Sequence, residues 1–252
     1  MKTKFFQKYS GVLRSEQAPV VRDPRLVMAE IGNVKIYYAP FEYINPMARI
    51  VLVGITPGPT QMVNANNTAR AALLAGLNGI DAMIRAKAVA AFSGEPMRSN
   101  LVNQLNHWGF NEWLGLGNSA EFFSGAAHLV QTTSLLRYPV FVDGEDYRGN
   151  PDMLKHPLLR QFLFDHFVAE VDVLKDAVFV GLGPMVQKVL DHLVKEGVVG
   201  KERVIGGMLH PSGNCTYRIN YLIGDREKPI PHATNPVSYD HGRRLFQEQY
   251  LR

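Results

Sequence analysis

The 252-residue sequence contains a single cysteine, Cys215. One cysteine excludes a disulfide within the chain and an iron–sulfur cluster held by four cysteines of one chain. Long hydrophobic runs are missing too, since no stretch reaches the roughly 20 apolar residues that a membrane-spanning helix needs. The charged N-terminus is not followed by the apolar core of a secretory signal. We therefore expect a cytoplasmic protein with no membrane partner.

Neither sign of charge dominates the sequence. The net charge is +4 at pH 7 and the isoelectric point is about 9.1. This modest basic excess permits a polyanionic partner such as DNA without requiring one. The histidines are scattered without the paired spacing of metal ligands, and the acidic segment 143–146 lacks the rest of a calcium loop. We expect no metal and no cofactor.

An apolar run, residues 49–61, ends abruptly in a glycine and proline loop. Its aliphatic residues 50–54 predict a strand buried on both faces, as in the centre of a parallel sheet. Hydrophobic patterns predict further strands at 34–38, 128–133, 177–183 and 203–209, and helices at 68–92, 99–108, 157–175, 184–195 and 239–251. Glycines at 76 and 79 weaken the first helix, which is compatible with two shorter helices.

Strands alternate with helices along the chain, which predicts an α/β fold with a parallel sheet covered on both faces. We expect one domain over residues 1–252, with an irregular N-terminal extension at 1–32 and a surface loop at 139–157. We expect the protein to be a monomer. Ligands of open α/β sheets bind beyond the carboxyl ends of the strands. Three strand-end loops are therefore candidates for chemistry, namely 54–61, 132–138 and 210–218.

Together these loops resemble the motifs of the uracil-DNA glycosylase superfamily. Residues 54–59 (GITPGP) resemble its first motif, commonly Gly-x-Asn-Pro-Gly in the mismatch-specific and single-strand-selective branches. Residues 210–213 (HPSG) resemble the last motif, and residues 131–136 (QTTSLL) occupy the place of the middle, base-recognising one. The resemblance covers about residues 49 to 220. It implies a three-layer α/β/α fold with a short, mainly parallel central sheet, and hydrolysis of the N-glycosidic bond of a deaminated or damaged base, uracil or a related base, in damaged or single-stranded DNA.

Such a reaction requires that the nucleotide leave the base stack and that the departing base be stabilised as an anion. His210 is placed for the second task, because an imidazole N–H can bond a developing negative oxygen. The alternative is a structural histidine whose ring is hydrogen-bonded within its own turn. Four residues of the first loop would let the backbone approach the base, since glycine lacks bulk and admits positive φ, although any sharp turn favours the same residues. They are Gly54, Ile55, Pro57 and Gly58.

The sequence departs from the family pattern at two positions. Thr56 stands where the related branches carry asparagine, and a threonine hydroxyl can hold water but is a poor base at neutral pH. A carboxylate such as Asp81, or one from the acidic loop, could substitute for it. Ser134 stands where the middle motif usually offers an asparagine that reads uracil. A hydroxyl cannot reproduce that paired contact, so a different damaged base is an open alternative.

The last loop resembles the family's wedge into DNA. Tyr217 or Arg218 could fill the hole left by a flipped base, while Ser212 and the backbone at Gly213 and Asn214 could hold phosphates. The ordinary alternatives are a buried tyrosine and a solvated arginine.

The prediction is thus a DNA glycosylase in which the turns bearing Thr56, Ser134 and His210 converge on one concavity. Two rivals stay open at this stage. One is a catalytically impaired nucleic-acid-binding member of the superfamily, and the other is a hydrolase of free nucleosides or nucleotides.

Overall fold

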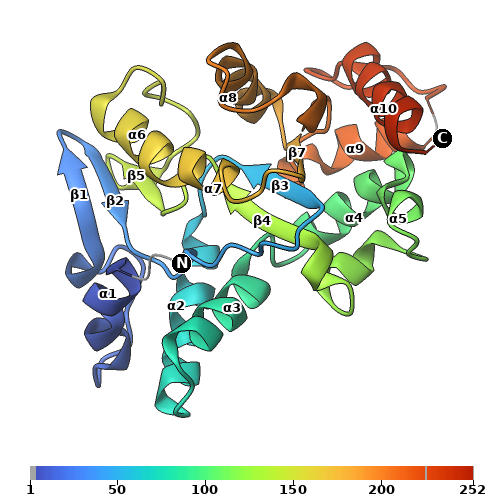
Figure 1. Cartoon of the computed structure of the whole chain (residues 1–252). Helices are drawn as coiled ribbons and strands as arrows, with labels where there is room; N and C mark the ends of the chain where they lie inside the picture. Colours follow the sequence, from blue (N-terminus) through green and yellow to red (C-terminus); the bar gives the residue numbers. More distant parts are fainter. Residues whose placement is uncertain (1–3, 225, 252) are drawn as a thin grey trace. The chain divides into compact units, whose positions relative to one another are not determined.

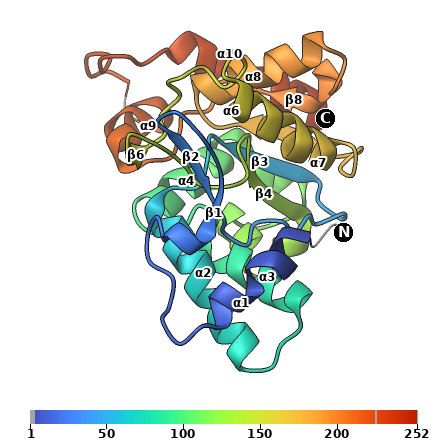
Figure 2. The ribbon, with the colours of Figure 1, turned by 90° about the vertical axis from the view of Figure 1, so that its left-hand side faces the viewer.

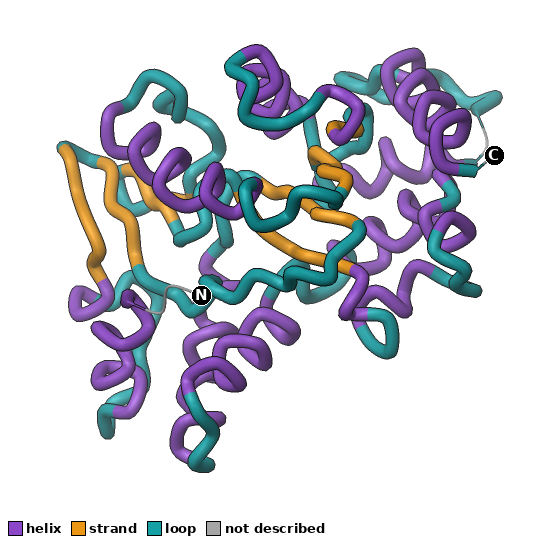
Figure 3. Tube along the Cα trace, viewed as in Figure 1, coloured by secondary structure: helices purple, strands orange, loops and turns teal. Residues whose placement is uncertain are grey.

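The computed structural model describes residues 4–224 and 226–251, which form a mixed α/β protein (Figure 1). Contacts divide the chain into two compact units, each made of three segments. Unit 1 contains Met1–Pro46, Ile55–Ala91 and Thr132–Lys175, and unit 2 contains Met47–Gly54, Phe92–Gln131 and Asp176–Arg252. Figure 3 shows the strands of two sheets among these segments. Whether the chain behaves as the expected single domain stays a prediction.

The central sheet has the strand order β4-β3-β7-β8. Its strands are β3 (Ile50–Gly54), β4 (Val130–Ser134), β7 (Val178–Gly181) and β8 (Val204–Ile205). β3 runs parallel to β7, and β7 runs parallel to β8. All five residues of β3 are buried, as expected for an aliphatic strand covered on both faces. The predicted fold class is confirmed: the sheet is mainly parallel and consistent with a three-layer α/β/α fold.

A second, antiparallel sheet lies in unit 1 and has the order β1-β2-β5-β6. Its strands are β1 (Val27–Ile31), β2 (Val34–Tyr37), β5 (Val140–Val142) and β6 (Glu145–Asp146). The prediction of a surface loop over 139–157 is therefore wrong for its first part. Asp143 and Gly144 both have positive φ, 53° and 80°, and form the two-residue turn of a β-hairpin. The Asp-Gly pair behind an apolar run was a signal for this hairpin.

The expectation of an irregular segment at 1–32 is wrong for most of its described part. Helix α1 spans Lys4–Arg14, and it buries Phe6, Tyr9 and Leu13 at helical spacing. A 3₁₀ turn, η1 (Pro24–Leu26), then leads into β1. Residues 1–3 of the predicted extension lie outside the described residues.

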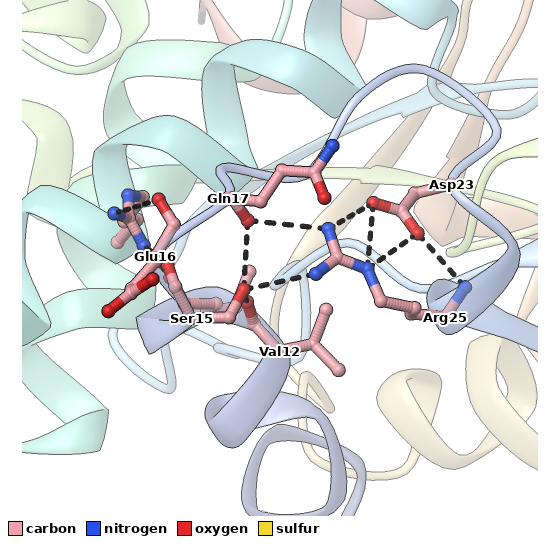
Figure 4. Close-up of polar contacts among 8 residues, drawn as sticks. Val12, Ser15, Glu16, Gln17, Asp23 and Arg25 are labelled. Carbon is pink, nitrogen blue, oxygen red and sulfur yellow. Dashed lines mark hydrogen bonds and ion pairs between the residues drawn. The ribbon is translucent and has the colours of Figure 1, made fainter.

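Two arginines, Arg25 and Arg70, hold the chain between α1 and η1, and Figure 4 shows the contacts of Arg25. The Arg25 guanidinium donates to the buried Asp23 carboxylate at 2.6 Å, to Ser15 Oγ at 3.2 Å and to the Gln17 carbonyl at 3.3 Å. This ion pair lowers the pKa of Asp23, chiefly through the hydrogen bond from Arg25. A segment without regular structure is thereby fixed by side-chain to backbone bonds.

The remaining helical segments of unit 1 are α2 (Pro59–Leu74), α3 (Gly79–Ala90), α6 (Pro157–Phe162), the π-helical turn η4 (Leu163–Val168) and α7 (Ala169–Val171). Helix α2 packs against α3 and α1 (Figure 2). The break at Gly76 and Gly79 is confirmed as the boundary between two helices. Helix α2 begins at Pro59 rather than at residue 68, so it follows the glycine and proline loop directly.

The helical segments of unit 2 are α4 (Met97–Trp108), α5 (Phe110–Trp113), η2 (Ser119–Phe123), η3 (Ala127–Leu129), α8 (Pro184–Lys195), η5 (Lys201–Arg203), η6 (Gly213–Cys215), α9 (Thr216–Ile223) and α10 (Pro236–Tyr250). An aromatic core joins α5 to α10, where Phe110 and Phe246 stack with centroids 4.0 Å apart. Gly242 of α10 approaches the loop after β8 so closely that a Cβ there would lie 2.0 Å from the Gly206 carbonyl oxygen. Only glycine fits at this crossing.

Candidate functional site

The first and middle loops lie side by side within unit 1. The Leu136 amide donates to the Ile55 carbonyl at 3.0 Å. Thr56 Oγ1 donates to the Tyr138 carbonyl at 2.9 Å and accepts from the Val140 amide at 3.2 Å. A hydroxyl has one hydrogen and two lone pairs, so Thr56 retains only one lone pair for any further contact. Its main role in this geometry is to join the two loops.

Gly54 ends β3 as a buried residue, and Pro57 is buried in the loop beyond it. Gly58 caps α2 with φ −81°, so positive φ, which the sequence argument invoked, is not what this position requires. A Cβ on Gly58 would have nothing within 4 Å, which leaves space beside the backbone. The Gln61 side chain accepts from the Gly58 amide at 3.3 Å and closes the turn.

Ser134 is half-buried at the end of β4. Its neighbour Thr133 is buried and donates through Oγ1 to Glu170 at 2.9 Å. Side chains alternate along a strand, so Ser134 and Thr133 point to opposite faces of β4. The position of Ser134 at the strand end agrees with the sequence prediction, and its role in base binding stays a prediction.

A buried ion pair supports the middle loop, and sequence reasoning missed it. Arg137 Nη2 lies 2.9 Å from Glu170 Oε2 and donates to the His166 carbonyl at 2.8 Å. Glu170 is completely buried. The π-helical turn η4 carries His166, and Glu170 follows it in α7. These charged residues lie about thirty positions apart in the sequence, and no local spacing signals the pair.

Glu42 and Lys87 extend this polar cluster of unit 1. Tyr38 donates its hydroxyl to Glu42 Oε2 at 3.1 Å, and Lys87 Nζ donates to the Tyr43 carbonyl at 2.5 Å. Burial raises the pKa of Glu42 to about 7 and lowers the pKa of Lys87 to about 8. Both groups therefore titrate closer to neutrality than exposed residues of their kind.

Three atoms of the cluster have no hydrogen-bond partner among the residues that the structure describes: Glu42 Oε1, Arg137 Nε and the Tyr138 hydroxyl. The Tyr138 hydroxyl lies near Arg137, and burial raises the pKa of Tyr138 far above its ordinary value. Burial also lowers the pKa of neighbouring His166 to about 4. Perturbed ionisable groups and unsatisfied buried atoms are typical of functional sites.

His210 lies in unit 2, where the turn after β7 packs against its backbone. Gly183 has φ 98°, and its amide donates to the Met208 carbonyl at 3.0 Å. A Cβ on Gly183 would stand 3.3 Å from His210 Cβ. The positive φ favours glycine here, and an added Cβ would also be in tight contact with His210.

The His210 ring has a defined hydrogen-bonding state. The Ser212 amide donates to Nδ1 at 3.2 Å. Nδ1 must therefore be the unprotonated nitrogen, and the neutral ring carries its proton on Nε2. Burial lowers the pKa of His210, which favours this neutral form at physiological pH. The half-buried ring thus offers Nε2–H as a donor.

Two buried amides of α4 fix the His210 loop, and neither was predicted. Gln104 donates to the Leu209 carbonyl at 3.2 Å and accepts from the Leu209 amide at 3.0 Å. Asn100 donates to the Pro211 carbonyl at 3.1 Å and to Thr216 Oγ1 at 2.8 Å. The two amides lie four residues apart on the helix face otherwise formed by buried apolar residues. Polar residues on an apolar helix face were the available signal.

The predicted DNA-contacting residues differ in their solvent exposure and in their contacts with the rest of the protein. Gly213 and Asn214 are exposed, and Tyr217 is 64% exposed. Arg218 is held by the protein, since its guanidinium donates to the Ala233 carbonyl at 3.1 Å and to Cys215 Sγ at 2.8 Å. Ser212 Oγ also contacts Cys215 Sγ, at 3.6 Å. Of the two wedge candidates, Tyr217 is the one whose side chain projects into solvent.

The structure thus brings Thr56 and Ser134 together within unit 1, and His210 together with Ser212 and Arg218 within unit 2. The expectation that the three turns share one concavity concerns both units and stays a prediction.

Within residues 4–224 and 226–251, no group of three or more His, Cys, Asp or Glu side chains is arranged to hold a metal ion. In the same part of the chain, no helix is long and apolar enough to cross a membrane.

The fold and its strand-end loops define an α/β protein built on a mainly parallel central sheet. The chain is 34% identical over 215 residues to a protein of Bacillus subtilis (strain 168), and the match covers 84% of this chain and 83% of the relative. That relative is the uncharacterized protein YoxB, and the chain belongs to the YoxB family. No protein-family model and no solved structure matches the chain.

Proposed function

We propose that this protein is a DNA glycosylase that hydrolyses the N-glycosidic bond of a deaminated or damaged base through an extracted nucleotide. The observation that carries the proposal is the state of His210, a half-buried neutral ring with Nε2–H as its donor. A departing pyrimidine or deaminated purine gains negative charge on a carbonyl oxygen. A fixed N–H donor aimed at that oxygen stabilises the charge as it develops.

The way the His210 loop is held supports this role. A donor stabilises a transition state only if it need not reorganise as the reaction proceeds. Gln104 and Asn100 bond the backbone on both sides of His210 and restrict its movement. Tyr217, exposed in the first turn of helix α9 that follows this loop, is suited to fill the space that an extracted base leaves in DNA.

Ser134 bears on which base is bound. A hydroxyl offers one rotatable donor and two acceptor lone pairs, whereas an asparagine amide donates and accepts in a fixed plane. The substrate of the proposed enzyme is therefore not restricted to uracil, and bases such as hypoxanthine and xanthine belong in the test.

One observation favours a second candidate, a nucleic-acid-binding protein without catalysis. The Thr56 hydroxyl donates its hydrogen to the Tyr138 carbonyl, so Thr56 is poorly suited to activating water. A binding protein that kept these loops but lost catalytic activity would have a residue at this position that is engaged in structure, as Thr56 is.

The experiment is a single-turnover assay on double-stranded and single-stranded oligonucleotides, each carrying one uracil, hypoxanthine or xanthine. Alkaline cleavage reports abasic sites. We expect product from at least one oligonucleotide, and His210→Ala should slow its formation by about 10²–10³-fold, the typical effect of removing one such donor. His232→Ala, which removes an exposed histidine of the same unit, is the matched control and should react at the wild-type rate.

Other results would identify the rivals. Tight DNA binding without product from any oligonucleotide favours the binding protein. Release of base from free nucleosides at a rate that DNA does not affect favours a nucleoside hydrolase. Equal activity of His210→Ala and the wild type would contradict the role given to His210.

A further inference from the structure

One face of α4 lies along the His210 loop, and both belong to unit 2. Residues spaced four positions apart on this face lie against alternate residues of the segment 207–213. Four helical residues rise about 6 Å, close to the length of two extended residues. The helix and the loop therefore match in register. The residues of this face are Pro96, Asn100, Gln104 and Trp108.

The two ends of the segment are in tight contact with α4. A Cβ on Gly213 would lie 3.4 Å from Pro96 Cγ, just before the helix begins. A Cβ on Gly207 would lie 3.4 Å from Trp108 Cη2, at the last residue of the helix. The contacts thus run in opposite directions along the two segments, and the hydrogen-bonding amides of α4 lie between these ends.

Asn100 differs from the other residues of this face because it bonds two segments of the chain. Its amide nitrogen donates to the Pro211 carbonyl at 3.1 Å and to Thr216 Oγ1 at 2.8 Å, which uses both of its hydrogens. The side chain is buried. Pro211 directly follows His210, and Thr216 is the first residue of α9 and directly precedes Tyr217. One amide therefore joins the neighbour of the histidine with the neighbour of the exposed tyrosine.

The chain between the two bonds of Asn100 forms a closed turn. The Cys215 amide donates to the Ser212 carbonyl at 2.8 Å, around the short helix η6. The Ser212 amide donates to His210 Nδ1. The first turn of α9 is thus connected to the His210 ring by two routes, one through this turn and one through the Asn100 amide.

We propose that Asn100 is a positioning residue that couples the contact of Tyr217 with DNA to the alignment of the His210 ring. This inference rests on the proposed glycosylase function. Insertion of Tyr217 into DNA presses on the first turn of α9, and the bonds of Asn100 keep the His210 loop in register with that turn. The histidine and the tyrosine then meet DNA as one rigid body. The N–H donor is in place for the base when the tyrosine fills the space that the base has left.

The test is a double-mutant cycle between Thr216 and Tyr217. Thr216→Val keeps the shape of the side chain but removes the acceptor of Asn100, while the bond from Asn100 to Pro211 remains. Single-turnover base release is measured with protein in saturating excess over the oligonucleotide that reacts best. Each single variant should slow the reaction by about tenfold, and the double variant should slow it by about tenfold as well, because coupled residues have non-additive effects. Independent effects would multiply to about a hundredfold.

Two further variants control for the loss of a hydroxyl. Thr216→Ser keeps an acceptor for Asn100 and should react at the wild-type rate. Thr234→Val is the matched control, since it makes the same substitution in the same unit at a hydroxyl that has no partner among the described residues. It should also react at the wild-type rate. Circular dichroism and urea unfolding verify that each variant is folded.

The coupling can also be measured without catalysis. The probe is a DNA duplex that contains one tetrahydrofuran analogue of an abasic site. When the wild type binds this duplex, the ¹⁵N resonances of the His210 ring should shift. In Thr216→Val this shift should be largely lost, while fluorescence anisotropy shows an unchanged affinity for the duplex.

The outcomes separate this inference from the proposed function. If the rate effects of Thr216→Val and Tyr217→Ala multiply, or if Thr216→Val reacts like the wild type, the role of Asn100 is overturned and the glycosylase stands. If the wild type releases no base but its His210 resonances shift on the duplex in a way that requires Thr216, the glycosylase falls and the coupling stands. A wild-type ring that does not respond to the duplex overturns the coupling.

Discussion

The two units use their buried polar side chains in different ways. In unit 2, Gln104 and Asn100 bond backbone groups of the His210 loop and hold a single ring in one tautomer. In unit 1, four charged residues (Glu42, Lys87, Arg137 and Glu170) are buried together with Tyr38 and Tyr138, and three polar atoms of this cluster lack a partner among the described residues. Satisfied amides make a rigid support at little cost, whereas buried charges reduce stability unless fully paired. A cluster of buried ionisable residues, such as that of unit 1, is therefore expected where a change of protonation state is part of the function.

Breaking the buried ion pair should have the largest effect. Arg137→Met leaves the Glu170 carboxylate buried without its cation, and such a change typically costs about 3–5 kcal/mol. Urea unfolding at pH 7 should show this loss in the free energy of unfolding. The double variant Arg137→Met with Glu170→Met should recover part of it, since no charge is then left alone. A single variant as stable as the wild type would mean that the pair is not buried.

Glu42 should make the stability of the protein depend on pH. Its folded pKa of about 7 lies above the ordinary 4.5, so the unfolded chain loses its proton first as pH rises. Stability is then full below about pH 4.5 and falls as pH rises to 7, by about 3 kcal/mol in total. Glu42→Gln cannot titrate. Relative to this variant, the wild type should lose about 3 kcal/mol between pH 4.5 and 8 in urea unfolding, and a constant difference would refute the raised pKa.

Removing a satisfied amide in unit 2 should have an intermediate effect. Gln104→Leu leaves the Leu209 amide and carbonyl without their partners, which costs about 1–3 kcal/mol. Asn103→Leu, on the exposed face of the same helix, should change stability by less than about 0.5 kcal/mol. Thermal and urea unfolding of the two variants measure the difference. Equal stabilities would show that Gln104 does not support the loop.

The exposed tyrosine should matter least for stability. Tyr217→Ala removes a side chain that is 64% exposed, so the free energy of unfolding should change by less than about 0.5 kcal/mol. If Tyr217 contacts bases, affinity for DNA should weaken by about 1–3 kcal/mol, the usual contribution of one stacked base. Fluorescence anisotropy at fixed salt concentration measures this. Unchanged affinity would remove Tyr217 from the DNA-contacting residues.

Much of the fold followed from hydrophobic periodicity. The aliphatic run was sufficient to predict β3, and the glycines at 76 and 79 indicated the division between α2 and α3, although not the beginning of α2 at Pro59. Helix α1 was missed, although Phe6, Tyr9 and Leu13 mark its buried face, because the prolines at 19 and 24 led to the interpretation of the whole segment 1–32 as irregular. The Asp143–Gly144 hairpin was missed because an acidic segment was interpreted as solvated.

The candidate site was predicted less completely than the fold. Motif-bearing loops such as the one at His210 are local in sequence and could be found there. Glu42 and Arg137 acquire their properties from burial and from contacts with distant residues, which no local pattern reports. The Thr56 hydroxyl likewise gains its partners only when the two loops meet.

The most direct test of the account is the protonation state of the His210 ring, measured by ¹⁵N NMR of histidine-labelled protein with His210→Ala for assignment. We predict a neutral ring at pH 6.5 to 7.5 with the proton on Nε2, and a pKa below that of an exposed histidine. A ring that is doubly protonated at pH 7, or that carries its proton on Nδ1, would contradict the account.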